Sequence, residues 1–281
     1  MEVFGTVASA LSVAALFNNC VDCFGYIQLG RHFGRDYEVY QLKLDIAKTR
    51  LSRWGQAVAI NDDPQFATDS PNEIPLRKAK AILEQIKLLF DVLQKSSDWY
   101  KIDAVQEELE LLQIQDMQLV ARNVHGRLNN IVSGRQKGTS LLKKARWALY
   151  DSKNFDKLVN QVTEFIDDLE KLFPVKDARR TLVEIEIEEL NDEPSLRVLQ
   201  SAAAGTDSVL SEVVTKRLEK CETRNSIKGL EAEGHTVVRN GNRYAMSYDG
   251  ADSASLTTNE LTSVKAKDNS QIYNGNSYGR D

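Results

Sequence analysis

The C-terminal part of the chain contains one pattern twice, and this repeat restricts the fold more than any other feature. Residues 225–244 (NSIKGLEAEGHTVVRNGNRY) align without a gap on residues 259–278 (NELTSVKAKDNSQIYNGNSY), so matched positions lie 34 residues apart. A repeat of this kind predicts two stacked rungs of a β-solenoid, with matched side chains about 4.8 Å apart.

Charged positions of the repeat support this stacking. Glu231 aligns with Lys265 and Glu233 aligns with Lys267, so the sign of the charge inverts at both positions. Side chains of opposite charge on neighbouring rungs attract, whereas equal charges would repel. The sequence therefore predicts two inter-rung ion pairs.

Amide and apolar positions of the repeat also match. We expect two asparagine ladders, Asn225 over Asn259 and Asn242 over Asn276, with amides hydrogen-bonded along the stacking axis. The Asn-Gly pairs suit the tight corners of such a winding. The predicted apolar core of the stack consists of Ile227 and Leu261, Leu230 and Val264, Ala232 and Ala266, and Val238 and Ile272.

Two rungs alone leave open strand edges above and below. Only further copies of the chain satisfy those edges, so we expect a tail that is disordered as a monomer and ordered in an amyloid fibril. After Cys221 the chain has no Pro, Cys, Trp or Phe and is rich in Asn, Ser, Thr and Gly. That composition by itself indicates a solvated linker, and the repeat favours the amyloid.

Residues 36–222 show helical periodicity, which predicts an all-α bundle. Apolar stripes predict helices through residues 40–54, 82–93, 109–117, 120–131, 141–148, 155–172 and 196–218. Residues 183–188 alternate between apolar residues and Glu, as a strand would. We predict a helix there, because a strand would be solitary and Glu is a good helix former.

The N-terminal segment is apolar, and Asp22 is the only charged residue between Val3 and Leu29. A signal peptide would begin with basic residues, but no Lys or Arg precedes Arg31. The clean apolar run is shorter than the roughly 20 residues of a membrane-spanning helix. The segment is therefore interpreted as either a core helix or a conditional membrane segment.

Several segments resemble the fungal HET-s/HET-S family of heterokaryon-incompatibility prion proteins. They are residues 16–24 (LFNNCVDCF), 30–37 (GRHFGRDY), 51–55 (LSRWG) and 147–151 (WALYD), together with Ala245 at the end of the first rung. The resemblance extends along the full chain and indicates an orthologue in a filamentous fungus. It implies a HeLo domain over residues 1–222 and a prion-forming domain over residues 223–281.

The resemblance implies a function in self/non-self recognition. In that family, amyloid formation by the tail disrupts the HeLo domain, and the exposed N-terminal segment, here residues 1–37, enters the plasma membrane and kills the cell. The implied toxicity residues are Phe4, Leu11, Leu16, Phe17, Asp22 and His32. The implied partners are the chain itself, HET-s-type relatives, a nucleotide-binding receptor with a similar amyloid motif, the plasma membrane and a second HeLo domain. The implied location is the cytoplasm, with relocation to the plasma membrane on activation.

Two residues of this segment support opposite conclusions about toxicity. In the inactive form of the family a proline stands at the place of His32, and proline disrupts a helix by about 3 kcal/mol. His32 therefore favours a killer, and the alternative is a solvated residue at a helix end. A carboxylate such as Asp22 costs several kcal/mol in a bilayer, which favours a non-toxic prion partner that co-polymerises with an active relative. A helical scaffold with a disordered, partner-binding tail is the third alternative.

Other chemistry has little support in the sequence. Cys20 and Cys23 lack two further nearby ligands for zinc, and the loop 134–140 (GRQKGTS) lacks phosphate-loop spacing. We expect no enzyme, no metal or other cofactor, and no nucleic acid. Residues 117–150 contain several basic side chains and no acidic side chain. This stretch suits acidic lipid headgroups, or an intramolecular or dimer contact with the acidic residues 184–193, and we favour the contact with the acidic residues.

Overall fold

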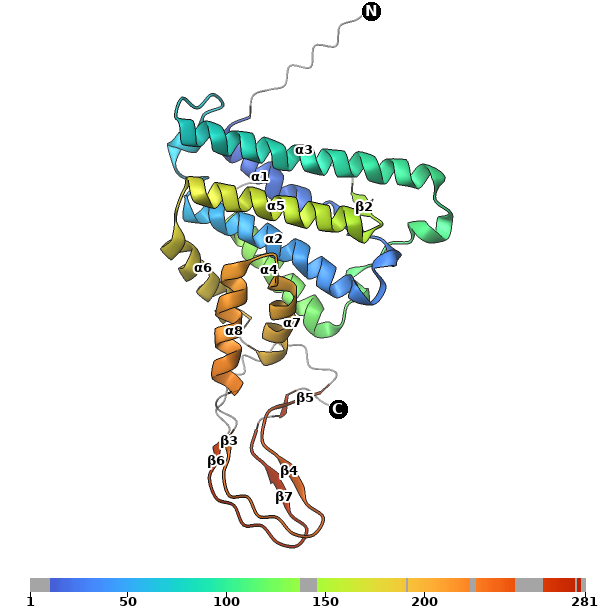
Figure 1. Cartoon of the computed structure of the whole chain (residues 1–281), viewed down its shortest axis with the longest axis vertical. Helices are drawn as coiled ribbons and strands as arrows, with labels where there is room; N and C mark the ends of the chain where they lie inside the picture. The colour runs from blue at the N-terminus through green and yellow to red at the C-terminus, as the bar shows by residue number, and fades with distance from the viewer. Residues whose placement is uncertain are drawn as a thin grey trace, which may run out of the picture.

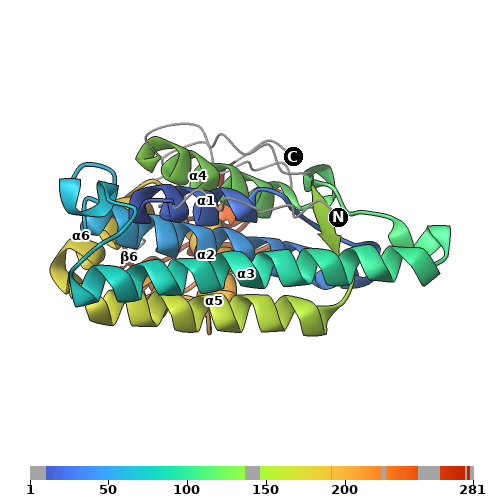
Figure 2. The same cartoon turned by 90° about the horizontal axis from the view of Figure 1, so that it is seen from above.

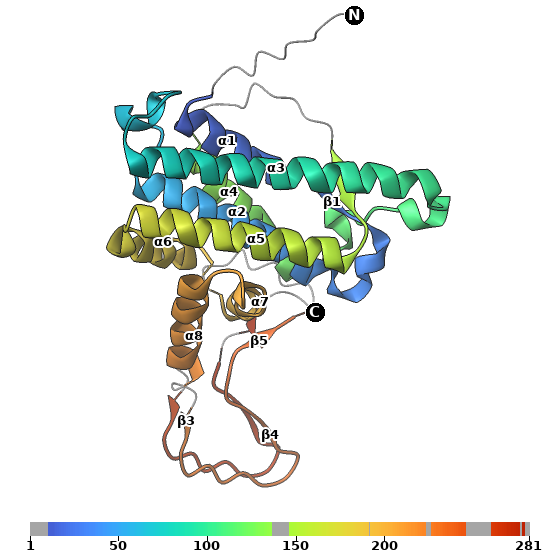
Figure 3. The ribbon, with the colours of Figure 1, turned by 45° about the horizontal axis from the view of Figure 1, so that its top comes forward.

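The computed structural model describes residues 11–136, 146–190, 192–222, 226–245, 260–275 and 277–278. These residues form a helical part from which a stranded tail projects beyond α7 and α8 (Figures 1 and 3). The helices are α1 (Val13–Phe24), α2 (Tyr37–Ala57), α3 (Ile74–Asp103), α4 (Leu119–Arg135), α5 (Ser152–Leu172), α6 (Lys176–Glu188), α7 (Glu193–Ala203) and α8 (Ser208–Glu222). The strands are β1 (Ile27–Leu29), β2 (Trp147–Leu149), β3 (Ser226–Ile227), β4 (Val237–Arg239), β5 (Arg243–Tyr244), β6 (Glu260–Leu261), β7 (Gln271–Tyr273) and β8 (Ser277–Tyr278).

Helix α2 lies at the centre of the helical part. It contacts α1, α4, α5, α6 and α7, while α3 packs against α1 and α5. Figure 2 shows α3 and α5 along one side of α2 and α4 on the opposite side. Because α2 meets neighbours on several sides, even its charged residue Arg53 is fully buried beside Leu51 and Trp54.

Helix α5 illustrates how the sequence specifies a helix. Asp151 caps its start, since the carboxylate accepts a hydrogen bond from the Asn154 N–H at 2.8 Å. The predicted apolar stripe is buried from Phe155 to Leu169. The predicted helices at 40–54, 82–93, 120–131, 155–172 and 183–188 are confirmed by α2, α3, α4, α5 and α6.

The helix predicted at 109–117 is wrong. The segment contains short 3-10 turns at Gln106–Leu109 and Ile114–Asp116 instead. Its backbone bonds to the N-terminal segment: the Leu112 N–H donates to the Leu29 carbonyl at 2.9 Å, and the Arg31 N–H donates to the Glu110 carbonyl at 2.8 Å. Backbone groups that bond to another segment cannot also close helical turns.

The helix predicted at 141–148 is wrong at its end, where residues 147–149 form strand β2. This strand pairs in parallel with β1, with Ile27 opposite Trp147 and Leu29 opposite Leu149. Both short strands are largely buried, and pairing satisfies their polar backbone groups. Residues 141–145 lie outside the described residues.

The single helix predicted at 196–218 is divided into α7 and α8. Gly205 has φ +75, a left-handed conformation that suits glycine and ends a helix. Asp207 then caps α8 by accepting from the Leu210 N–H at 3.1 Å. Apart from the small β1–β2 sheet, the predicted helical fold of the N-terminal part is confirmed.

Candidate functional site: the stacked repeats and the N-terminal segment

The two repeats of the tail lie side by side as parallel strands (Figure 1). Three strand pairs form, β3 with β6, β4 with β7 and β5 with β8. Their registers place Ile227 opposite Leu261, Val238 opposite Ile272, and Tyr244 opposite Tyr278. The two residues of every matched pair are 34 residues apart, as in the sequence repeat. The strand register in the structure is therefore the register of the sequence alignment.

Between the strands, backbone hydrogen bonds continue this register. The Glu231 N–H donates to the Val264 carbonyl at 2.9 Å, and the Ala266 N–H donates to the Glu231 carbonyl at 2.9 Å. These bonds bring together the predicted pairs Leu230 with Val264 and Ala232 with Ala266. In this single chain the described tail residues are paired rung to rung. Disorder of the monomeric tail stays a prediction. The fibril of many copies stays a prediction.

The predicted apolar core is only half-buried in one copy. Leu230, Ala232, Val238, Leu261, Val264, Ala266 and Ile272 are partly buried. Ile227 is 48% exposed. Two rungs therefore leave apolar surface that further rungs would cover.

One of the two predicted ion pairs forms. Lys265 Nζ lies 3.4 Å from Glu231 Oε2, with side chains 75% and 69% exposed. Within the described residues, Glu233 and Lys267 do not approach to ion-pair distance. Exposed pairs contribute little and are screened by salt, so their geometry is loosely held.

An amide contact occurs at a matched position next to a predicted ladder. Asn274 Nδ2 lies 3.5 Å from Asn240 Oδ1, one rung apart. Of the predicted ladder residues, Asn242 is described, whereas Asn225, Asn259 and Asn276 lie outside the described residues. Gly275 stands at the corner of the second rung, where a Cβ atom would lie 1.9 Å from the Gly241 carbonyl oxygen. The corners therefore stack more closely than any side chain would permit.

Sequence reasoning missed one contact between the rungs. The guanidinium of Arg239 lies 4.6 Å from the centre of the Tyr273 ring, and the two residues are opposite in the register of β4 and β7. Their alignment in the repeat was visible, but Arg over Tyr is not a pair of opposite charges. An aromatic residue matched with a basic residue was the signal that could have revealed it.

The N-terminal segment is part of the helical core. Leu16 and Phe17 of α1 are each 3% exposed, and Leu11 packs against the core. The Phe17 ring rests against α2 at Gly55, where a Cβ atom would lie 2.2 Å from the ring. Gly55 thus permits the close approach of α1 to α2. The predicted residue Phe4 lies outside the described residues.

Asp22 and His32 have different surroundings. Gln136 Nε2 donates to Asp22 Oδ1 at 2.9 Å. Asp22 Oδ2 is buried and accepts no hydrogen bond from the described residues. His32 is exposed in the 3-10 turn Arg31–Asp36, beside a hollow lined by aromatic residues including Tyr100 and Tyr150. Because one buried oxygen of Asp22 lacks a hydrogen bond, Asp22 destabilises the packing of the C-terminal end of α1.

A buried ionic cluster anchors the start of α8, and the sequence did not reveal it. Arg53 Nη1 lies 2.6 Å from Asp207 Oδ2, and Arg53 Nη2 lies 2.5 Å from Glu186 Oε2, with all three side chains at most 1% exposed. Arg50 binds Glu170 at 2.7 Å and donates to the Thr206 carbonyl at 3.2 Å. The cluster joins α2, α5 and α6 to the turn before α8.

The opposite charges of this cluster stabilise each other in the ionised form. Burial works against the charged form of Arg53, but the carboxylates of Asp207 and Glu186 outweigh it and raise the pKa of Arg53. Burial alone would raise the pKa of Asp207, but Arg53 and Arg50 outweigh it and lower that pKa. Removal of one member would leave an uncompensated buried charge.

Comparison with known proteins decides the family. The sequence model of the HeLo family, described as prion-inhibition and propagation, matches residues 5–199. The chain belongs to the HeLo family. The resemblance expected from the sequence is thereby confirmed.

Relatives of this HeLo protein match nearly its full length. Heterokaryon incompatibility protein s of Podospora anserina is 49% identical over 99% of this chain and 97% of its own length. Heterokaryon incompatibility protein S of the same species is 48% identical over the same shares. The HET-s/HET-S family therefore includes relatives of both the helical part and the tail.

Two solved structures resemble the helical part. The HET-S N-terminal domain has a TM-score of 0.74 and 52% identity, covering 76% of this chain and 96% of that chain. A variant of the HET-s N-terminal domain, with one aspartate changed to alanine and one proline to histidine, has a TM-score of 0.72 and 53% identity. It covers 74% of this chain and 99% of that chain.

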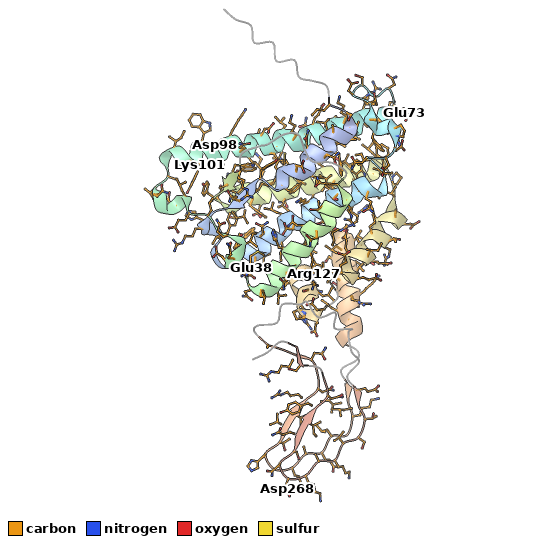
Figure 4. The ribbon with its side chains drawn as sticks, turned by 180° about the vertical axis from the view of Figure 1, so that it is seen from behind. Glu38, Glu73, Asp98, Lys101, Arg127 and Asp268 are labelled. Carbon is orange, nitrogen blue, oxygen red and sulfur yellow. The ribbon has the colours of Figure 1, made fainter. Side chains whose placement is uncertain are left out.

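The basic stretch of this HeLo protein makes internal contacts, as favoured from the sequence. Figure 4 shows Arg127 beside the helices that follow α5. Its Nη1 lies 3.3 Å from Asp192 Oδ2 and donates to the Glu189 carbonyl at 3.0 Å. Arg135 Nη1 lies 2.7 Å from Glu186 Oε1, an ion pair without hydrogen-bond geometry. Residues 137–145 lie outside the described residues.

The described residues contain no group of three or more His, Cys, Asp or Glu placed to hold a metal ion. Cys20 and Cys23 are buried thiols, and Cys20 Sγ lies 3.3 Å from the Leu83 carbonyl oxygen. Among the described helices, none has the length and apolar character needed to cross a membrane.

Proposed function

We propose that this HeLo protein is a prion-type, amyloid-controlled cell-death effector in fungal self/non-self recognition. The tail, residues 223–281, templates a β-solenoid amyloid and thereby disrupts the effector domain, residues 1–222. The released N-terminal segment, residues 1–37, then permeabilises the plasma membrane. The observation that carries this proposal is the parallel pairing of the two repeats in one register, with strand edges that are open on both sides within the described part of the chain.

Coupling between tail and domain is supported by the anchoring of α8. Strand β3 begins at Ser226, shortly after α8 ends at Glu222. The other end of α8 is held by Asp207 in the buried ionic cluster. Growth of a fibril on β3 therefore strains α8 and pulls Asp207 out of the cluster. The buried charge of Arg53 then lacks this partner. That destabilisation reaches α2, on which α1 packs.

The proposed partners follow from this mechanism. They are further copies of the chain, HET-s-type relatives, a nucleotide-binding receptor with a similar amyloid motif, and the plasma membrane, with a HeLo-domain dimer as a resting form. The protein resides in the cytoplasm and relocates to the plasma membrane on activation. It acts by assembly and membrane insertion, without catalysis, cofactor or nucleic acid.

The test uses the full-length chain with vesicles of phosphatidylcholine and phosphatidylserine that contain a quenched dye. We expect leakage after addition of fibrils of the same chain, and none from a chain lacking residues 223–281 or residues 1–10. Fibre diffraction of the product is expected to show a meridional repeat of about 4.7–4.8 Å. A chain that remains soluble after seeding would overturn the proposal.

Asp22 favours a second candidate, a non-toxic prion partner that co-polymerises with an active relative. Its carboxylate lies in the segment that enters the bilayer, where it costs several kcal/mol. For this candidate we expect fibrils without leakage from the natural chain, and leakage restored by Asp22→Ala. Strong leakage from the natural chain would exclude it.

A further inference from the structure

Arg239 and Tyr273 form a cation–π contact between the two rungs. The guanidinium carbon lies 4.6 Å from the ring centre, well within the roughly 6 Å over which such contacts act. Both residues end their strands, Arg239 in β4 and Tyr273 in β7, and both are exposed, the ring by 53%. Figure 1 shows β4 and β7 side by side in the tail.

Each of these strands has one free edge in a single copy, within the described residues. Strand β4 pairs only with β7, through bonds such as the Asn274 N–H to the Arg239 carbonyl at 3.0 Å. Parallel strands present the same spacing of donors and acceptors on both edges. The β4 of a second copy can therefore add to the free edge of β7 in the register seen inside one chain.

Such addition repeats the Arg239–Tyr273 contact between copies. Rungs of about 4.8 Å place a second guanidinium over the other face of the Tyr273 ring. Every ring then lies between two guanidinium groups, one of its own chain and one of the next. The contact within one chain thus shows the side chains that meet at the junction between chains.

We propose that the Arg239–Tyr273 contact is a selectivity determinant of templating, which rests on the amyloid function proposed above. The end of a growing fibril accepts a chain that carries a guanidinium at this position on one rung and an aromatic ring on the next. It disfavours tails that place two cations or two small side chains there, because specificity requires a penalty for the wrong partner as well as a contact for the right one.

Other pairs of the stack discriminate less. The apolar pair Val238 and Ile272 accepts any apolar side chain of similar size. The Glu231–Lys265 pair is at least 69% exposed on each side and is screened by salt. The stacked ring and guanidinium have a defined geometry, and a mismatch places Arg over Arg.

The first test measures the concentration of full-length chain that stays soluble after seeding with wild-type fibrils. We expect Arg239→Ala and Tyr273→Leu to raise this concentration about fivefold, and Tyr273→Phe to leave it near the wild-type value. Lys228→Ala is the control, since it removes a positive charge from an exposed position of the same rung. Equal effects of Arg239→Ala and Lys228→Ala would overturn the inference.

The second test separates selectivity from stability. The double variant Arg239→Tyr and Tyr273→Arg exchanges the two side chains, so its own stack again alternates ring and guanidinium. We expect it to grow on its own fibrils and to grow at least about fivefold more slowly on wild-type fibrils, whose ends meet it with Arg over Arg or ring over ring. Equal growth on both seeds would overturn the inference while leaving amyloid templating intact. Failure of the wild-type chain to form fibrils would overturn both.

Discussion

The helical domain and the tail satisfy their backbone hydrogen bonds in opposite ways. Each helix closes its hydrogen bonds within itself and buries one face, as α2 does with Arg53 fully buried. The described residues of the tail close their bonds between rungs and leave free edges and a partly exposed apolar core, such as Ile227 at 48%. Figure 4 shows Asp268 at the far tip of that tail, away from the helices. The helical domain, here the closed region, completes its backbone hydrogen bonds in one copy. The tail, here the open region, can complete them only with further copies.

The largest effect is expected from Arg53→Met, which should affect only the closed region. It leaves Asp207 buried without its ion-pair partner and Glu186 paired with Arg135 alone, which destabilises the helical domain by about 3–5 kcal/mol. Urea unfolding followed by circular dichroism at helix wavelengths measures the loss. Lys171→Ala is the control, because its ion pair with Asp168 is exposed and contributes little. A loss no larger than that of the control would contradict the anchoring role of the cluster.

A smaller effect, confined to the open region, is expected from Gly275→Ala. The new methyl group would lie 1.9 Å from the Gly241 carbonyl oxygen, and overpacking of this kind costs about 1–3 kcal/mol. The soluble concentration after seeding should rise while helix unfolding stays unchanged. Gly134→Ala is the control, since a Cβ atom there meets nothing within 4 Å. If Gly275→Ala lowered helix stability, the separation of the two regions would be wrong.

Charge inversion on one rung should have a still smaller effect. Glu231→Lys places two cations one rung apart, and exposed pairs contribute up to about 1 kcal/mol. Seeded growth should slow at low salt and recover as salt screens the repulsion. Combining Glu231→Lys with Lys265→Glu restores opposite signs and should restore growth. Equal growth of the single variant, the double variant and the wild type at low salt would refute the stacking of charges.

The smallest effect is expected from pH and concerns the closed region. His125 Nδ1 lies 2.7 Å from Asp45 Oδ2. Burial opposes protonation of His125, but the hydrogen bond and charge of Asp45 outweigh burial and the nearby Lys48, and raise the pKa of His125. A raised pKa contributes stability below the unfolded value of about 6.5, which is lost as pH rises through the folded value.

The unfolding free energy of the helical domain should therefore fall in the wild type as pH rises above about 6.5, and fall less in His125→Gln. Urea titrations at several pH values measure the difference. Parallel pH profiles of the two proteins would show that the His125–Asp45 pair contributes nothing.

Local patterns in the sequence predicted most of both regions. The apolar stripe of α5 predicted its helix, and the ungapped repeat predicted the register that joins Val238 to Ile272. Two of the errors in the helical part were of one kind. Strand β2 and the irregular segment near Leu112 depend on pairing with β1, over 100 residues away for Trp147. No periodicity within a segment records such a partner.

By itself, the sequence determined which face of each helix is apolar and which residues of the two rungs meet. Both are periodic properties, and an ungapped repeat permits only one alignment. The tertiary structure alone decided that Arg53 would be buried with Glu186 and Asp207, and that Gly55 would receive the Phe17 ring. These contacts depend on which elements meet and at what distance, and periodicity describes a side chain only relative to its own element.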